Sequence, residues 1–145
     1  MAPSKKPITP SKLALFSCSP VIGAWWEELD ARGLFEGGKP ELSALNKQLL
    51  ADGRRHEQVL LSKLEKEGKR VARLPGKQNE SDYAATKAAM AEGFDFIHQA
   101  SLCNEEMRGS ADLLRRIEQP SALGEWGYIP IECKLASKPK TTFLV

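Results

Sequence analysis

Two acids and a lysine near the end of the chain are the residues best suited to act together in a reaction. Glu132 and Lys134 are two positions apart in the run 128–135, so on a strand their side chains would share one face. Asp112 lies upstream in a second strand-like run. Mg²⁺ prefers carboxylate oxygens, and a bound Mg²⁺ or Mn²⁺ activates water and neutralises charge developing at phosphorus. On adjacent strands, Asp112 and Glu132 would hold such an ion and Lys134 would orient the attacking water.

Three predicted strands must position these residues. They cover 94–103, 107–118 and 128–135, and a hairpin turn at 104–106 and a loop at 119–127 join them into a mainly antiparallel meander. Alternation places Ile129, Ile131 and Cys133 on the core face of the last strand. It also places His98 on the core face of the first strand, where we expect a structural histidine. A short edge strand is expected at 69–74.

The strongest helical signal covers 41–66. Seven residues of this segment recur at intervals of three or four positions and would therefore form a stripe along one side of the helix, which we expect to be buried. They are Leu42, Leu45, Leu49, Gly53, His56, Leu60 and Leu64. His56 therefore lies on the stripe and Glu57 at its edge. Shorter helices are expected at 10–18, at 21–32 and at 82–92, where Ser81 is the expected N-cap, and another helix begins at 141–145.

Three motifs occur in order along the chain: Gly53-Arg-Arg-His-Glu57, Gly109-x-x-Asp112 and Glu132-x-Lys134. Together they resemble the RecB-like branch of the PD-(D/E)XK nuclease superfamily. The stretches 8–13, 53–57, 99–102, 118–124 and 134–136 resemble bacterial putative RecB-like nucleases most closely, so the likeness runs along nearly the whole chain. It implies an α/β, restriction-endonuclease-like core with N-terminal helices and a three-stranded meander. The family's next helix, with a Gln-x-x-x-Tyr signature, and its last strand are missing, so the chain reads as truncated.

The resemblance also implies a role for each matching residue. Asp112, Glu132 and Lys134 would be catalytic. The metal ligands would be His56, Asp112, Glu132 and the backbone carbonyl of Cys133, with Glu57 as a carboxylate behind them. The residues expected to contact nucleic acid are Arg54, Arg55, Lys138 and Lys140. An imidazole ligand makes Mn²⁺ more plausible than it is for an all-oxygen site.

Each residue taken alone also has a simpler interpretation. Isolated acids are usually at the surface, a Glu132–Lys134 ion pair would contribute about 0–1 kcal/mol, and His56 alone would be a core histidine. Whether burial lowers the pKa of Lys134 or the two acids hold it up is left open by the sequence.

Composition limits the remaining possibilities. The 145 residues fit one domain, with a helical segment at 1–40 and a partial nuclease core at 41–145. The formal net charge is only +2, so basic patches rather than a global field would contact phosphates. No apolar run approaches the roughly 20 residues of a membrane span, and no signal peptide is evident, so we expect a cytoplasmic protein without a membrane partner. Cys18, Cys103 and Cys133 cannot supply four thiolates, so no iron–sulfur cluster is expected.

The sequence therefore predicts a metal-dependent nuclease that hydrolyses DNA phosphodiester bonds, with single strands or ends as its substrate by family analogy. Two alternatives stay open. One is a catalytically inactive nucleic-acid-binding or regulatory remnant. The other is a homo-oligomeric assembly protein that pairs through an open sheet edge.

Overall fold

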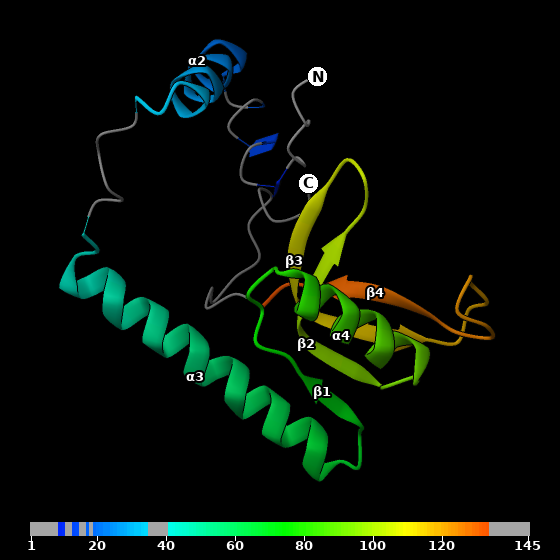
Figure 1. Cartoon of the computed structure of the whole chain (residues 1–145). Coiled ribbons are helices and arrows are strands. Elements are labelled where there is room, and N and C mark those ends of the chain that lie inside the picture. The colour runs from blue at the N-terminus through cyan, green and yellow to red at the C-terminus, as the bar shows by residue number, and fades with distance from the viewer. Residues whose placement is uncertain (1–8, 11–12, 15–16, 18, 35–40, 134–145) are drawn as a thin grey trace.

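The computed structural model describes residues 9–10, 13–14, 17, 19–34 and 41–133. In chain order they form α2 (Pro20–Ala31), α3 (Ala44–Lys66), β1 (Val71–Arg73), α4 (Glu80–Ala91), β2 (Phe96–Cys103), β3 (Arg108–Ile117) and β4 (Gly127–Ile131) (Figure 1). The predicted elements between 41 and 131 are therefore confirmed, with ends shifted by a few residues. The last strand ends at Ile131, whereas the sequence predicted that it would continue to 135. Lys134 and the predicted helix start at 141–145 lie outside the described residues.

The strands form one four-stranded sheet in the order β1-β2-β3-β4. β2, β3 and β4 are antiparallel neighbours, which confirms the predicted meander. β1 is the predicted edge strand, and it pairs with β2 in parallel. A parallel pair needs a crossover connection, and α4 supplies it. The α/β class is thus confirmed, with four strands in the sheet rather than three.

Helix α4 packs on one face of this sheet. Ala89 of α4 forms the buried cluster with Ile97, Ala100 and Leu114 of β2 and β3. Thr86 strengthens the contact, because its hydroxyl accepts the backbone N–H of Ser101 at 3.0 Å and donates to the carbonyl of Asp82 at 2.9 Å. The N-cap lies two residues before the predicted one, since Asn79 and not Ser81 accepts the N–H of Asp82 at 2.9 Å.

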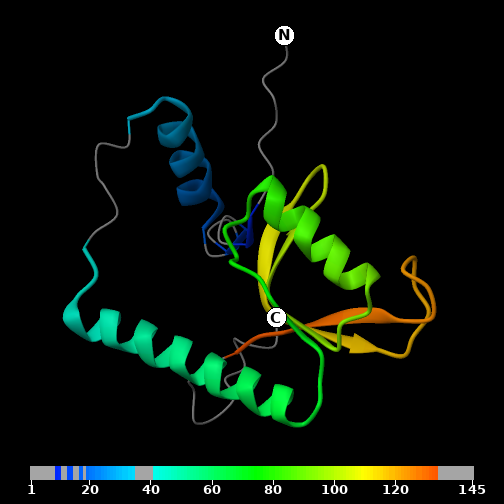
Figure 2. The ribbon, with the colours of Figure 1, turned by 60° about the horizontal axis from the view of Figure 1, so that its bottom comes forward.

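Helix α3 lies on the opposite side of the sheet from α4, as Figures 1 and 2 show. Strand β1 alternates between the two helices: Ala72 packs against the α4 cluster, while Arg73 turns to α3. The Arg73 guanidinium donates to Glu65 at 2.8 and 2.9 Å and also bonds Gln58. The hydrogen bond from Arg73 lowers the pKa of the exposed Glu65 carboxyl. These contacts fasten the C-terminal half of α3 to the sheet.

The predicted buried stripe on α3 is wrong for its first half. Leu42, Leu45 and Leu49 are 47%, 65% and 51% exposed, whereas Leu61 is only 1% exposed. The reason is that only the later turns of α3 approach β1, while its first turns extend away from the sheet (Figure 2). The face of α3 turned to the sheet also lies further round the helix than the predicted stripe, because it carries Leu61 rather than Leu60.

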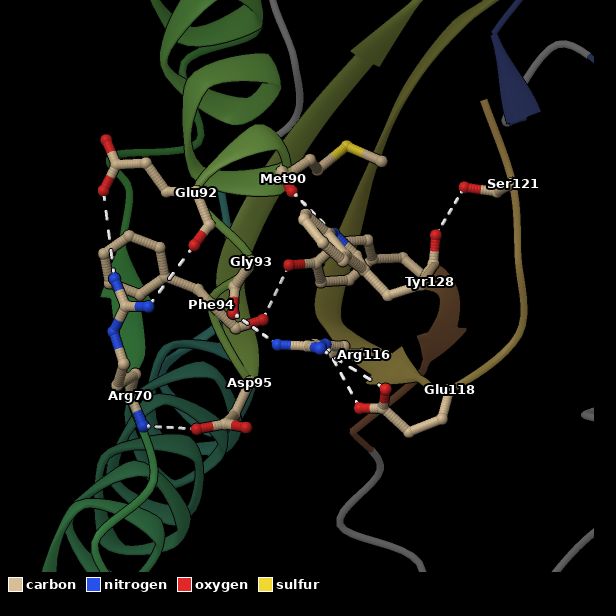
Figure 3. Close-up of polar contacts among 11 residues, drawn as sticks. Arg70, Met90, Glu92, Gly93, Phe94, Asp95, Arg116, Glu118, Ser121 and Tyr128 are labelled. Carbon is tan, nitrogen blue, oxygen red and sulfur yellow. Dashed lines mark hydrogen bonds and ion pairs between the residues drawn. The ribbon is translucent and has the colours of Figure 1, made fainter. Parts of the chain in front are cut away.

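A set of polar contacts fastens the end of α4 to β3 and β4 (Figure 3). The Trp126 indole N–H donates to the carbonyl of Met90 at 3.1 Å, and the Tyr128 hydroxyl donates to that of Phe94 at 2.6 Å. Arg116 lies over the Trp126 ring at 4.9 Å and donates to the carbonyl of Gly93. These donors add side-chain bonds to the carbonyl of Met90, in the last turn of α4, and to the carbonyls of Gly93 and Phe94 that follow the helix, so this corner of the fold is structural. None of the described helices combines the length and the apolar character that crossing a bilayer requires.

Candidate active site

The two predicted acids are neighbours across β3 and the end of β4. Leu113 pairs with Ile131 in the antiparallel register, so one step further Asp112 lies opposite Glu132. A carboxylate oxygen of Asp112 accepts the backbone N–H of Cys133 at 2.9 Å. Glu132 is exposed just beyond the end of β4. The predicted proximity of Asp112 to the Glu132–Cys133 segment is therefore confirmed. The prediction that the Cys133 carbonyl binds a metal ion concerns a different atom and stays a prediction.

Strand β2 is irregular directly beside Asp112. The register pairs His98 with Leu113 and Ala100 with Ala111, but it skips Gln99 and Asp112, which lie opposite each other. Gln99 has a φ of 54°, a conformation that residues other than glycine rarely adopt. Strained backbone of this kind is concentrated at functional sites. The irregularity thus marks the position of Asp112 as unusual on structural grounds alone.

The irregularity also turns two consecutive side chains toward α3. Glu57 of α3 lies 3.0 Å from Nε2 of His98, and the Gln99 amide donates to the same carboxylate oxygen at 3.4 Å. In a regular strand His98 and Gln99 would point to opposite faces. Ile97 and Ala100 belong to the same buried cluster under α4, which confirms that the alternation is broken between them. The His98 side chain is only 12% exposed and its cross-strand neighbour is the buried Leu113, so the prediction of a core-facing His98 is confirmed, whereas the faces predicted for Gln99 and Ala100 are wrong.

The residue that α3 presents to the sheet is Glu57, and His56 is exposed. Successive helical residues are rotated by about 100°, so a histidine next to an inward-facing Glu57 turns to the side. The prediction of a buried His56 is wrong for this reason. Glu57 occupies the place that the sequence analysis gave to His56.

Three carboxylates act together on the Cys133 thiol. Burial raises the pKa of this thiol, and the negative charges of Asp112, Glu57 and Glu132 raise it further. An electrostatic effect of this kind requires the acids to be close to the sulfur. One acid comes from α3, one from β3 and one from the end of β4. Acids from three segments that are distant in the sequence therefore contribute negative potential around Cys133.

The donor set fits a magnesium-like ion only in part. No three His, Cys, Asp or Glu side chains among residues 41–133 and the earlier described positions are placed to hold one metal ion. Asp112 and Glu132 remain as a pair, and Mg²⁺ commonly takes only one or two protein carboxylates, with water in its other positions. Because His56 does not join the acids, the argument for Mn²⁺ over Mg²⁺ loses its basis.

The predicted basic contacts divide into three groups. Arg54 lines a groove with Glu57, His98 and Gln99, whereas Arg55 lines a different groove with Val59 and Lys63. The other predicted contacts, Lys138 and Lys140, lie outside the described residues, as does Lys134. Only Arg54 is therefore placed beside the acidic residues.

Sequence reasoning missed His98 and Gln99 as parts of this site. The dipeptide stands in a strand-like run and follows no motif with a mechanism. One available signal was the presence of two consecutive polar residues, His98 and Gln99, in a predicted strand, together with an acid, Glu57, at the edge of the stripe on the long helix.

No family model, curated protein or solved structure matches this chain. The resemblance to RecB-like nucleases consequently rests on the sequence motifs.

Proposed function

We propose that this chain carries the active site of a metal-dependent nuclease with a restriction-endonuclease-like core, acting on DNA in the cytoplasm. The observation that supports it best is the register that sets Asp112 opposite Glu132, with the Cys133 N–H bonded to Asp112 at 2.9 Å. Two hard oxygen ligands at adjacent positions of two strands suit Mg²⁺ or Mn²⁺.

Asp112 and Glu132 would hold a divalent ion, which when bound would supply an activated water and neutralise charge at the phosphorus. The bond from the Cys133 N–H keeps the Asp112 carboxylate in one position, so little ordering is needed when the ion arrives. Lys134, two residues after Glu132 in the sequence, is proposed to orient the water or stabilise the anionic phosphorane.

Glu57 and His98 have a supporting role in this proposal. Glu57 is fixed by His98 and Gln99, and Gln99 lies opposite Asp112 in the register. A carboxylate held in this way adds negative potential near the ion without needing to be a direct ligand. In this proposal Glu57, and not His56, is the residue that helix α3 contributes to the site.

A nuclease assay tests the proposal. Single-stranded and duplex DNA are incubated with Mg²⁺ or Mn²⁺ and with wild type, Asp112→Asn, Glu132→Gln, Lys134→Ala or His56→Ala. We expect the first three variants to lose roughly a hundredfold or more in rate, as is typical when a group that stabilises the transition state is removed, and His56→Ala to retain activity. Cleavage by Asp112→Asn and Glu132→Gln at the wild-type rate would refute the assignment.

A second candidate function is self-assembly, which one observation favours. Leu45, Leu49 and Leu50 are exposed on the first half of α3, and Leu42 is exposed just before the helix begins. Exposed apolar groups of this kind commonly mark interaction surfaces. Light scattering across a concentration series tests it: a wild-type dimer that Leu45→Glu converts to monomer would support assembly through α3. A wild-type monomer at all concentrations would exclude it.

A further inference from the structure

A groove of about 530 Å³ opens between α3, the segment after β1, and β2. Its walls are of two kinds, apolar on one side and polar on the other. The lining residues are Leu49, Leu50, Gly53, Arg54, Glu57, Gln58, Leu74, Pro75, His98 and Gln99. The polar side is the Glu57–His98–Gln99 group, and Gln99 lies opposite Asp112 in the register of β2 and β3, although Asp112 itself does not line the groove.

The apolar side consists of aliphatic surface that is still accessible. Leu49 and Leu50 are 51% and 50% exposed, and Pro75 is also exposed. Two exposed leucines of α3, together with an exposed proline from the segment after β1, favour a ligand with a flat apolar face. A nucleobase has two such faces, and stacking or packing a base against a protein surface contributes to binding without sequence preference.

The polar side can bind the edge of such a ring. A carboxylate oxygen of Glu57 is held by His98 at 3.0 Å and by the Gln99 amide at 3.4 Å, so the carboxylate has a fixed orientation. Carboxylates accept hydrogen bonds from the exocyclic amino group of cytosine. Gly76, with φ of +66°, keeps the Gln99 side chain in place, since an added Cβ would lie 2.9 Å from its Oε1.

Arg54 gives the groove its positive charge. Its side chain is exposed, and it has no hydrogen bond or ion pair with any of the described residues. A guanidinium binds phosphate oxygens in a bidentate manner. The groove therefore combines an aliphatic wall, an oriented hydrogen-bond acceptor and an unpaired cation. These features match the face of the base, the edge of the base and the phosphate of one nucleotide.

We propose that this groove binds one unpaired base of a single-stranded nucleic acid, with a neighbouring phosphate on Arg54. The inference rests on the proposed nuclease function and assigns a binding site for one base of its substrate to this groove. Because the base edge must reach Glu57, a base within a duplex is excluded. A strand held there would continue past Gln99 toward Asp112 and Glu132.

Fluorescence anisotropy in EDTA tests the groove, because without divalent ions no cleavage can occur. The probes are end-labelled oligomers of deoxycytidine and of deoxythymidine and a blunt duplex of the same length. We expect Arg54→Ala to weaken single-strand binding roughly tenfold, as loss of a charged hydrogen bond does, and the matched variant Arg55→Ala to weaken it less than about twofold. Glu57→Gln should reduce the preference for deoxycytidine over deoxythymidine.

Two results would overturn the inference. One is an equal loss in Arg54→Ala and Arg55→Ala, which would mean that only net charge matters. The other is equal affinity for the duplex and for single strands. If single-strand binding depends on Arg54 but the protein cleaves no DNA in Mg²⁺ or Mn²⁺, the binding groove is supported and the nuclease proposal is refuted. If the protein cleaves DNA and Arg54→Ala binds single strands like wild type, the nuclease proposal is supported and the binding groove is refuted.

Discussion

Asp112 and Cys133 are joined by a hydrogen bond of 2.9 Å from the backbone N–H of Cys133 to the Asp112 carboxylate. This bond ties the middle of β3 to the segment that leaves β4, one residue after Glu132. The acid is thus oriented by the chain that carries its proposed partner. A carboxylate with a fixed position has less entropy to lose when it binds an ion.

Replacing Asp112 by Asn should lower the pKa of the Cys133 thiol. Asn keeps the shape and an oxygen acceptor for the Cys133 N–H but removes one of the three negative charges that raise this pKa. The pH dependence of alkylation at Cys133, followed by peptide mass spectrometry, measures the change. Glu106→Gln is the control, because Glu106 lies in the exposed hairpin turn and should leave the profile unchanged. An unaltered profile in Asp112→Asn would mean that Asp112 is not close to the thiol.

Stability should fall as the pH rises through the titration of Cys133. Burial raises the pKa of this thiol in the folded chain, so the folded state holds the proton more tightly than the unfolded state. The contribution is complete below the unfolded pKa and is lost as the pH rises through the folded pKa. Burial of Tyr128 raises its pKa and acts in the same direction at higher pH. Urea unfolding from neutral to alkaline pH, compared with Cys133→Ser, measures the thiol part; a stability that increases over this window would contradict it.

Two leucines on α3 should differ strongly in their effect on stability. Leu61 is 1% exposed, so Leu61→Ala should cost about 2–5 kcal/mol of unfolding free energy. Leu45 is 65% exposed, and Leu45→Ala should stay within about 0.5 kcal/mol. Chemical denaturation of the two variants checks this. Similar losses would mean that the first half of α3 is covered in the folded protein.

The contrast between these leucines shows what periodicity can predict. Steps of three and four indicated the α3 helix correctly, because any partly apolar helix produces them. They did not indicate which face of α3 meets the sheet, since that depends on Arg73 bonding Glu65 and on Leu61 entering the core. A rotation of one residue exchanges His56 for Glu57. The sequence of α3 alone contains no information on that rotation.

Gln99 shows a second limit. Alternation predicted strand β2 and its pairing with β3, and both are present. It also predicted opposite faces for His98 and Gln99, which the φ of 54° at Gln99 prevents. Glutamine has no preference for this conformation, so it comes from the tertiary setting, where Gln99 bonds Glu57 and Gly76 leaves room for its side chain. The acids Asp112 and Glu132 were predictable, because strand register and residue type determine their proximity.

Substitutions at Gln99 should separate backbone strain from side-chain contacts. Gln99→Ala removes the bond to Glu57 and keeps the unfavourable φ, whereas Gln99→Gly removes the bond and relieves the strain. We expect Gln99→Gly to be more stable than Gln99→Ala by about 1 kcal/mol, while His98 keeps its contact with Glu57 in both variants. Thermal or urea unfolding measures the difference. The reverse order of stability would show that Gln99 does not adopt the left-handed conformation.

The proposed function requires that Asp112 and Glu132 bind one metal ion and that His56 is not among its ligands. Titration calorimetry or electron paramagnetic resonance with Mn²⁺ alone measures that binding in wild type, Asp112→Asn, Glu132→Gln and His56→Ala, with no need for substrate. We predict loss of roughly tenfold or more in affinity for each acid variant, since each removes a charged ligand, and wild-type affinity for His56→Ala. Unchanged binding in both acid variants, or loss only in His56→Ala, would contradict the proposed site.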